Sequence, residues 1–496
     1  MSLKQADLDI LRAQTINPKG HFISGQVVDA ASEARIEVTS PIDGKVITTL
    51  AKGSAEDVDR AVASARHAFE TRSWAGQSPA ARKKVLLRLA ELIERDALDI
   101  AVQGVRDNGT EIGMAFKAES GSAAGTFRYY AEAIDKISGE VAPTDPNVLG
   151  LVHHEPVGVV GAILPWNFPL MIGAWKVAPA LAMGNSIVVK PAESASLSIL
   201  RLAELASEAG VPDGVFNVVT GKGSEVGEAM GLSMDIDVLV FTGSGGVGRR
   251  LLEYSARSNL KRCYLELGGK SPNVVFADTE NLDHAAMISA GGIFRNSGQV
   301  CVAGSRLIVE KSIHDEFVDA LIRHANALKV GDPLDLTSNV GAVHSITQLE
   351  QDLGFVEKAL AEGADCALGG TRILQETGGY YMEPTVLTNV GRNDTVNQQE
   401  VFGPVLAVST FETEEQAVDL ANSTVYGLAS GVWTANLSRA HRMIRSIRAG
   451  VVHVNTYGGA DNTVPLGGVG QSGNGHDKSL HALDKYVDLK TAWIQL

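Results

Sequence analysis

The sequence has few cysteines and no long apolar run. Its 496 residues include only three cysteines, Cys263, Cys301 and Cys366, which are too scattered for a disulfide framework or a CxxC metal cluster. No apolar run approaches the roughly 20 residues of a membrane-spanning helix, and the N-terminus lacks the basic region and apolar core of a signal peptide. These absences predict a soluble, unexported protein of a reducing cytoplasm.

The sequence also lacks an excess of basic residues. It has 43 Lys and Arg against 58 Asp and Glu, which gives a formal net charge of −15. Without a clustered basic stretch there is no electrostatic footprint for nucleic acid or for an anionic membrane surface. We therefore expect neither as a partner, and small substrates, including cationic ones, fit this charge better.

The length predicts about three domains, at roughly 150 residues each. Residues 1–53 have short apolar runs broken by Gly, Pro and Asp, which predict strands and turns. A capping box at Ser54 to Asp57 and the pair Ser78-Pro79 each predict the start of a helix. The N-terminal part of the chain is therefore expected to change from strands to helices near residue 54.

From about Gly158 short apolar strands alternate with helices. This alternation predicts right-handed βαβ units and a parallel sheet that is covered on both faces. The alternation resumes after Gly268-Gly269, which indicates a second α/β domain, with helices expected from Asn281 and Asp315. Residues 486–496 are strand-like, so they must pair with another strand.

A glycine motif follows one of these strands. Gly243-Ser244-Gly245-Gly246-Val247-Gly248 fits G-x-G-x-x-G and opens a predicted helix, whose backbone amides could hold a pyrophosphate. The same pattern fits Gly468, Gly470 and Gly473, where no strand, turn and helix surround it. A plain tight turn therefore stays open as the alternative for the first match.

Glu266 has three interpretations on the residues alone. A dinucleotide-binding fold places a ribose-binding acid roughly 20 positions after its glycine motif, and Glu266 follows Gly248 at close to this spacing. It is also compatible with a solvated or ion-paired strand end. As a partly buried carboxylate with a raised pKa, it would be a usable general base.

Cys301 is the candidate nucleophile among the three cysteines. It follows polar residues and Gly298, which indicates a loop open to a substrate, although a lone cysteine is most often a small buried residue. We keep that buried interpretation for Cys263 and Cys366. The 12 histidines show no metal-ligand spacing, and the adjacent His153-His154 would point to opposite faces of a strand, so no metal is expected.

Six motifs, in order along nearly the whole chain, resemble those of the NAD(P)-dependent aldehyde dehydrogenase superfamily. They are Pro165-Trp166-Asn167-Phe168-Pro169, Lys190-Pro191-Ala192-Glu193, Phe241-Thr242-Gly243-Ser244, Glu266-Leu267-Gly268-Gly269-Lys270, Gly298-Gln299-Val300-Cys301 and Glu400-Val401-Phe402-Gly403-Pro404. The resemblance implies an α/β fold with a Rossmann-like parallel-sheet NAD-binding domain, a second α/β catalytic domain and a small β oligomerisation arm. The implied boundaries are 1–138 with 157–267, 268–478, and 139–156 with 479–496.

The resemblance also implies a mechanism. Cys301 would attack the aldehyde carbonyl, and the Asn167 side chain and the Cys301 backbone N–H would hold the oxyanion of the thiohemiacetal. Transfer of hydride to the nicotinamide leaves a thioester, which a water activated by Glu266 hydrolyses, so the ribose interpretation of Glu266 is withdrawn. Lys176 and Asp477 would relay the proton outward; many relatives carry Glu at the latter position, and the shorter Asp is expected to reach less far.

The implied cofactor is NAD, with NADP as a weaker alternative. Lys190 and Glu193 would hold the adenosine ribose, and the Glu193 carboxylate should repel a 2′-phosphate. Ser244 and the helix after Gly245 would face the pyrophosphate. The full set of residues expected at the cofactor is Ile163, Leu164, Trp166, Lys190, Glu193, Gly223, Ser244, Val247, Glu400 and Phe402.

For the substrate, residues 437–443 and 471–483 resemble the branch that oxidises γ-glutamyl-γ-aminobutyraldehyde and 4-guanidinobutyraldehyde in polyamine and arginine breakdown. Asp461 would lie at the tunnel mouth and pair with a cationic group, or it caps its own turn. Phe168, Trp175 and Leu466 would line the tunnel, although plain core packing is the alternative for all three. A broad-specificity aliphatic or aromatic aldehyde dehydrogenase is the second interpretation.

Other classes fit less well. A thiol hydrolase would not need the cofactor motifs, an inactive binding protein would be expected to have lost Cys301, Glu266 or Asn167, and a CoA-acylating relative would not need Glu266. Residues 108–111 depart from the family pattern, and we expect them to reshape the substrate entrance or a subunit contact. The resemblance also implies that the strand-like C-terminus joins a linker near residues 139–156 in an arm that crosses to another subunit, so a homodimer or a homotetramer is expected.

Overall fold

The first α/β domain is built on a mainly parallel sheet. The computed structural model describes residues 3–459 and 461–496, and within them the strands of this sheet have the order β11-β10-β7-β8-β9-β1-β2. Neighbours from β11 to β9 are parallel, whereas β1 pairs antiparallel with β9 and with β2. The strands are β1 (His21–Ile23), β2 (Gln26–Val28), β7 (Val159–Ile163), β8 (Ser186–Lys190), β9 (Phe216–Val218), β10 (Val238–Thr242) and β11 (Arg262–Glu266).

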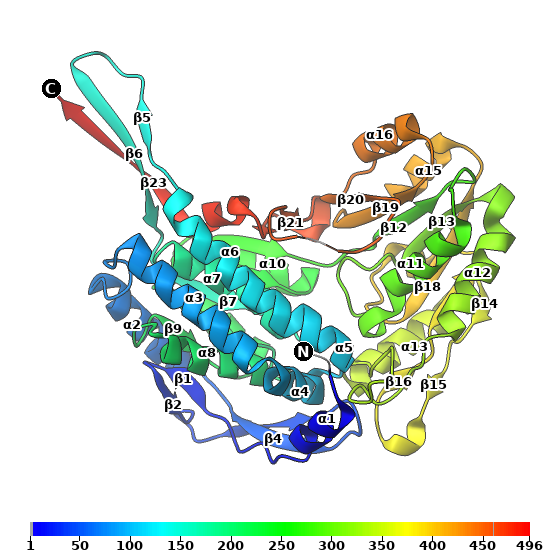
Figure 1. Ribbon diagram of the computed structural model, residues 1–496, viewed down its shortest axis with the longest axis horizontal. Helices are drawn as coiled ribbons and strands as arrows, with labels where there is room; N and C mark the ends of the chain where they lie inside the picture. The colour runs from blue at the N-terminus through cyan, green and yellow to red at the C-terminus, as the bar shows by residue number, and fades with distance from the viewer. Residues whose placement is uncertain (1–2, 460) are drawn as a thin grey trace.

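Helices cover both faces of this sheet (Figure 1). The capping box predicted at Ser54 is present and opens α2, and the Ser78 side chain accepts from Ala81 N–H at the start of α3, which confirms both predicted helix starts. The helices are α2 (Ala55–Glu70), α3 (Pro79–Arg95), α4 (Ala97–Asn108), α5 (Ile112–Met114), α6 (Ser122–Ala133), α7 (Pro169–Ala182), α8 (Leu197–Ala209), α9 (Glu228–Leu232) and α10 (Gly245–Ala256), with π-helical turns η1 (Ala115–Gly121) and η3 (Gly223–Gly227).

The second α/β domain repeats this layered plan. Its sheet has the order β14-β17-β18-β13-β12-β19-β20 and is parallel except where β14 meets β17. The strands are β12 (Pro272–Val275), β13 (Arg306–Glu310), β14 (Asp365–Leu368), β17 (Thr385–Thr388), β18 (Val405–Phe411), β19 (Ala429–Trp433) and β20 (Val451–Val454). The helices are α11 (Leu282–Phe294), α12 (His314–Asn326), α13 (Ile346–Ala361), α14 (Thr395–Gln398), α15 (Glu414–Ala421) and α16 (Leu437–Ser446).

A β arm projects away from both domains (Figure 1). The C-terminal strand β23 (Val487–Gln495) pairs antiparallel along its whole length with β6 (Val148–Pro156), which also pairs with β5 (Glu140–Ala142). Residues 486–496 thus have the strand partner that their pattern requires. Two short hairpins, β3 (Arg35–Thr39) with β4 (Val46–Ala51) and β15 (Arg372–Ile373) with β16 (Tyr381–Met382), and the pair β21 (Leu466–Gly467) with β22 (His476–Asp477) complete the strands.

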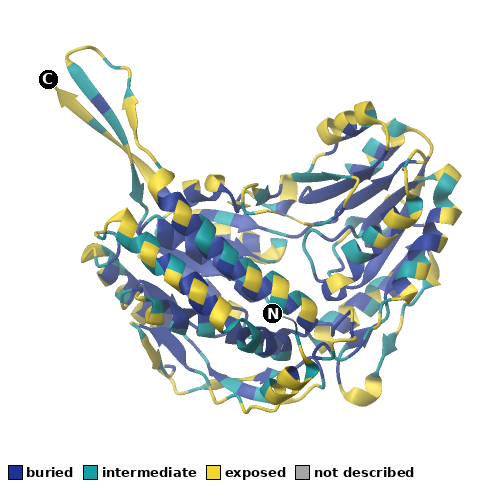
Figure 2. Cartoon of the chain, viewed as in Figure 1, coloured by how far each residue is buried: buried dark blue, intermediate teal, exposed yellow. Residues whose placement is uncertain are grey.

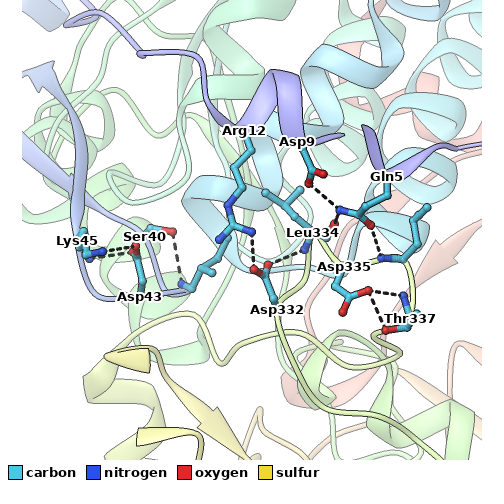
Figure 3. A network of polar contacts seen from close by, with 12 residues as sticks. Gln5, Asp9, Arg12, Ser40, Asp43, Lys45, Asp332, Leu334, Asp335 and Thr337 are labelled. Carbon is cyan, nitrogen blue, oxygen red and sulfur yellow. Dashed lines mark hydrogen bonds and ion pairs between the residues drawn. The ribbon is translucent and has the colours of Figure 1, made fainter. Parts of the chain in front are cut away.

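Helix α1 (Gln5–Arg12) was not predicted, because residues 1–53 indicated strands and turns. Its N-cap residue makes no side-chain capping bond, so its stability comes from partners far along the chain. Arg12 pairs with Asp332, and Gln5 bonds the backbone of residues 334 and 336 (Figure 3). Leu8 is fully buried. Helix α1 is therefore fastened to the loop that precedes α13.

The central strands of both sheets are buried (Figure 2). Cys263 lies in this core as predicted, but Cys366 is exposed, so its predicted burial is wrong. Cys366 sits on β14, which forms the antiparallel edge of its sheet and has exposed residues at most positions. Among the described helices, none has the length and apolar character needed to cross a membrane.

Candidate active site

A cavity of about 350 Å³ opens where the carboxyl ends of the first sheet meet the second domain. Residues that follow β7, β10 and β11 line one side, as expected for a ligand crevice at the carboxyl ends of parallel strands. Its lining includes Trp166, Asn167, Ile172, Thr242, Ser244, Leu267, Cys301, Gln348, Gln351, Phe355, Glu400 and Phe402. The candidate nucleophile therefore shares one cavity with several predicted cofactor residues.

Cys301 is presented by a tight turn after α11. Asn296 and Ser297 adopt left-handed backbone conformations with φ of +50° and +52°, which non-glycine residues rarely adopt. Cys301 itself is partly exposed. The pKa of the thiol is raised to about 12, first because the site shields the sulfur from water and then because Glu400 and Glu266 carry negative charge nearby. The thiol is therefore protonated at neutral pH and needs a base to become a nucleophile.

Asn167 is fixed to the turn that carries Cys301. Its side chain is buried, and its Nδ2 donates to the Gln299 carbonyl at 2.8 Å, in the turn that carries Cys301. A primary amide has two N–H groups, so this bond leaves one N–H for a second acceptor. The arrangement suits the predicted role of Asn167 as an oxyanion donor.

Glu266 ends β11 and is buried, with a side chain that is 6% exposed. Its Oε1 has no hydrogen-bond partner among the described residues. Burial first, and then the negative charge of Asp477, raise the pKa of Glu266 well above its usual value, against the opposing charges of Lys176 and Lys485. A carboxylate in this environment is a stronger base than one in water.

Behind Glu266, Asp477 lies between two buried lysines. Its two oxygens accept from Lys176 Nζ at 2.6 Å and from Lys485 Nζ at 2.7 Å. Burial would raise the pKa of Asp477, but the two cations outweigh burial and lower it. Asp477 thus reaches Lys176 in spite of its short side chain, contrary to the doubt raised by the sequence.

The cofactor side combines a helix N-terminus with polar groups that have no partner. Ser244 caps α10, whose first backbone N–H groups form an anion site, and the buried Thr242 Oγ1 has no partner among the described residues. Trp166 stacks on His344 with ring centroids 4.2 Å apart, and its ring meets Phe402 edge-on. These residues fit a dinucleotide that enters along the carboxyl ends of the strands.

Lys190 and Glu193 form an ion pair of 3.1 Å at the end of β8. Burial opposes ionisation of Glu193, but the charge of Lys190 and backbone hydrogen bonds, including one from Gly223, outweigh it and lower the Glu193 pKa. Glu400 Oε1 accepts from Gly269 N–H at 2.8 Å, and burial raises the Glu400 pKa to about 7. Both carboxylates are therefore held in fixed positions.

The remaining predicted cofactor residues take other positions. The side chains of Ile163 and Leu164 are buried in core clusters, so only their backbone can meet a ligand, whereas Val247 in the first turn of α10 is 39% exposed. Ile163, Leu164, Lys190, Glu193, Gly223 and Val247 lie outside the lining of the cavity described above.

Three of the four predicted substrate residues gather in one apolar cluster. Phe168 and Trp175 are buried together with Ile172, and Leu466 packs against them. Ile172 also lines the cavity, so the cluster adjoins the site of Cys301. Asp461 is exposed, and its Oδ1 accepts from Thr463 N–H at 2.8 Å, which is the local turn cap left open as its alternative.

Residues 108–111 lie beneath the Cys301 turn. Thr110 Oγ1 donates to Asn296 Oδ1 at 2.8 Å, and Glu111 accepts from Asn296 N–H at 3.3 Å. Asn108, Thr110 and Glu111 are all buried, so the expectation that they shape the substrate entrance or a subunit contact is wrong. They support the turn from within.

Several residues at the site were missed in the sequence. Gln348, Gln351 and Phe355 come from α13, whose position relative to the cavity no local motif reveals. Lys485 was missed because lysines are rarely buried. Lys478 was missed although it directly follows Asp477, and that adjacency was the available signal.

Comparison with known proteins agrees with this geometry. The model of the aldehyde dehydrogenase family matches residues 27–492. The NADP/NAD-dependent aldehyde dehydrogenase PuuC of Escherichia coli is 46% identical over 475 residues, which cover 96% of this chain and 95% of that protein.

Two solved structures are similar over 100% of both chains, each with a TM-score of 0.98 and 47% identity. One is the indole-3-acetaldehyde dehydrogenase of P. syringae in complex with NAD+ and IAA. The other is the γ-glutamyl-γ-aminobutyraldehyde dehydrogenase of Burkholderia cenocepacia. The fold class expected from the sequence is confirmed.

Proposed function

This chain belongs to the aldehyde dehydrogenase family, and from this premise we propose how its residues oxidise an aldehyde to a carboxylic acid with NAD. The observation that carries the proposal is the placement of Cys301 and Asn167 in one cavity, with the buried Glu266 near the thiol. NAD, when bound, accepts a hydride. The chain itself supplies the nucleophile, the oxyanion donors and the base.

Cys301 Sγ forms a bond to the aldehyde carbon after its proton leaves to a base. The free N–H of Asn167 and the backbone N–H of Cys301 hold the oxyanion, and loss of one such donor costs about 10²–10³ in rate. Loss of a hydride from the former aldehyde carbon would leave that carbon bound to Cys301 Sγ as a thioester, and Glu266 removes a proton from the water that hydrolyses it. Lys176, Asp477 and Lys485 form the buried polar path along which that proton leaves.

Residues of the first domain hold most of the cofactor, and two residues of the second domain complete its site. Lys190 and Glu193 bind the adenosine ribose, the α10 N-terminus with Ser244 binds the pyrophosphate, and Glu400 and Phe402 position the nicotinamide ribose and ring. The ionised Glu193 disfavours a 2′-phosphate, so NAD is used better than NADP.

For the substrate, we propose an amino-, guanidino- or γ-glutamylamino-aldehyde of polyamine or arginine catabolism. A relative named as an aminoacetaldehyde dehydrogenase and a solved structure named as a γ-glutamyl-γ-aminobutyraldehyde dehydrogenase support this choice. Phe168, Trp175 and Leu466 hold the aliphatic part. An aromatic aldehyde is the second candidate, because the same apolar cluster and the similarity to an indole-3-acetaldehyde dehydrogenase favour it.

We also propose which part of the chain performs each role. Residues 1–138 and 157–267 bind the cofactor, residues 268–478 carry the nucleophile, and residues 139–156 and 479–496 join subunits into a dimer or tetramer in the cytoplasm. The exposed apolar side chains of Leu489, Trp493 and Leu496 on the arm support a subunit contact there.

The test is NADH formation at 340 nm with 4-aminobutyraldehyde, 4-guanidinobutyraldehyde, γ-glutamyl-γ-aminobutyraldehyde, indole-3-acetaldehyde and hexanal, each with NAD and with NADP. We expect the nitrogen-containing aliphatic aldehydes to be used best, and Cys301→Ala to reduce all rates to background. Asp461→Asn should raise KM for the cationic aldehydes about twofold to fivefold, as for an exposed ion pair, and leave hexanal unchanged.

Asp365→Asn, which removes another exposed carboxylate, is the matched control. Equal changes of KM for cationic aldehydes and hexanal in Asp461→Asn would contradict the role of Asp461. Turnover of none of the aldehydes would contradict the proposed reaction.

A further inference from the structure

Lys478 is a buried lysine beside the proposed substrate site. Its side chain is only 6% exposed, and its Nζ lies 4.6 Å from the centroid of the Trp175 ring. The Lys478 backbone is left-handed, with φ of +63°, and Ser479 follows with +52°. Two successive non-glycine residues in this conformation are costly, so the surrounding fold must hold the lysine in place.

The ammonium group of Lys478 has no hydrogen bond or ion pair within the described residues. The neighbouring Asp477 is already bonded by Lys176 and Lys485, and the Asp461 carboxylate lies beyond the 4 Å of an ion pair. Burial lowers the pKa of Lys478, while Asp477 and Asp461 oppose that change. Among the described residues its charge is met by the Trp175 ring and by no ion-paired carboxylate, so this position can accept an anionic ligand.

A second donor without a partner lies in contact with it. Trp175 Nε1 is buried and has no acceptor among the described residues. Trp175 belongs to the apolar cluster that adjoins the Cys301 cavity through Ile172. An ammonium group and an indole N–H that lie close to one another match a carboxylate, which accepts hydrogen bonds only.

Asp461 supplies the opposite charge nearby. Its charge and that of Lys478 influence each other's pKa, although the two groups form no ion pair. A ligand that carries an anionic and a cationic group on one carbon offers each of these two residues a group of opposite charge. A simple aminoaldehyde or guanidinoaldehyde would use Asp461 but would meet the like charge of Lys478.

We propose that Lys478 is a specificity-determining residue that binds a substrate carboxylate, so that Lys478 and Asp461 together select the zwitterionic α-amino acid end of a γ-glutamyl aldehyde. This inference rests on the proposed aldehyde oxidation and narrows its substrate class. In the α-amino acid end, the carboxylate and the ammonium are attached to one carbon. The aliphatic remainder then extends along the Phe168 and Trp175 cluster towards Cys301.

The experiment combines enzyme variants with modified substrates. Lys478→Met keeps an apolar side chain over Trp175 and removes the charge, Lys478→Arg restores a cation, and Lys311→Met removes an exposed lysine as the matched control. The substrates are γ-glutamyl-γ-aminobutyraldehyde, the same aldehyde with its α-carboxylate converted to an amide, adipate semialdehyde as a carboxylate without nitrogen, and hexanal.

We expect Lys478→Met to raise KM for the γ-glutamyl aldehyde about tenfold to hundredfold, the usual range for loss of a hydrogen-bonded charge, with little change in kcat. Lys478→Arg should recover part of this loss. The wild type should lose a similar factor on the amide substrate, and Lys478→Met should show no additional loss on it. Hexanal kinetics should stay within about twofold of the wild type in all variants.

Two results would overturn the inference: equal use of the acid and the amide by the wild type, or an equal loss on hexanal in Lys478→Met. If the wild type does not prefer nitrogen-containing aldehydes at all, the proposed substrate class fails separately. Adipate semialdehyde then decides on Lys478, because a loss relative to hexanal in Lys478→Met supports carboxylate binding and no loss refutes it.

Discussion

Replacement of Asp477 by Asn tests whether the buried charge cluster supports catalysis as well as folding. In the wild type, Asp477 lies 2.6 Å and 2.7 Å from two lysine Nζ atoms that are nearly inaccessible to solvent. Each of these contacts has a Coulomb energy of about 6 kcal/mol at an effective dielectric constant of 20, before desolvation is counted. Loss of one partner from a buried ion pair typically costs about 3–5 kcal/mol of unfolding free energy. We therefore expect Asp477→Asn to unfold at clearly lower denaturant concentration.

The same substitution should change the pH dependence in a direction fixed by charge. Asp477 raises the pKa of Glu266, while Lys176 and Lys485 lower it. Without the negative charge the Glu266 pKa falls, so the base becomes active at lower pH. A residual interaction of about 1.4 kcal/mol between the two carboxylates corresponds to about one pH unit.

The assay is kcat against pH for hydrolysis-limited turnover, together with denaturant unfolding of the same preparations. The matched control is Asp488→Asn, which removes an exposed carboxylate of the arm that pairs with Arg262. It should change neither the pH dependence of kcat nor the unfolding midpoint. Loss of stability with an unmoved acid limb would refute the electrostatic link between Asp477 and Glu266. An acid limb shifted to higher pH would refute the assigned sign.

Two further predictions concern the turn that carries the nucleophile. Glu400 has a pKa of about 7 and is charged at pH 8, so Glu400→Gln should lower the Cys301 pKa and speed alkylation of Cys301 by iodoacetamide severalfold. The rate is followed by mass spectrometry in a Cys366→Ser background, because Cys366 is exposed. An unchanged rate would contradict the effect of Glu400. Burial raises the Glu111 pKa to about 7. As pH rises from about 4.5 to about 7, the free energy of unfolding of the wild type, measured in denaturant, should therefore fall by about 3 kcal/mol relative to that of Glu111→Gln. A difference that stays constant with pH would contradict burial as the cause.

Local signals predicted much of the fold. The capping residues Ser54 and Ser78 mark helix starts because they satisfy backbone N–H groups within their own turn. Glu266 was identified as a strand-end carboxylate because apolar residues precede it and glycines follow. Such features depend on neighbours in the sequence, which a single chain displays directly.

Other features depend on contacts between distant segments. Helix α1 has no capping side chain and is held by residues 332–336, so its own sequence does not reveal it. The position of Asp477 between Lys176 and Lys485 arises only when β22 packs beside α7. The surroundings of residues 108–111 likewise follow from the Asn296 turn, almost two hundred positions away in the chain.

A short segment of the chain connects the buried surroundings of Asp477 with the β arm. Lys485, which bonds Asp477, is followed by Tyr486, whose carbonyl accepts from Asn185 Nδ2 and from Val157 N–H, and the next residue begins β23. A displacement of the arm would therefore be transmitted to Lys485 and to its ion pair with Asp477. A protein that binds the arm would, through this short segment, also restrain that buried ion pair.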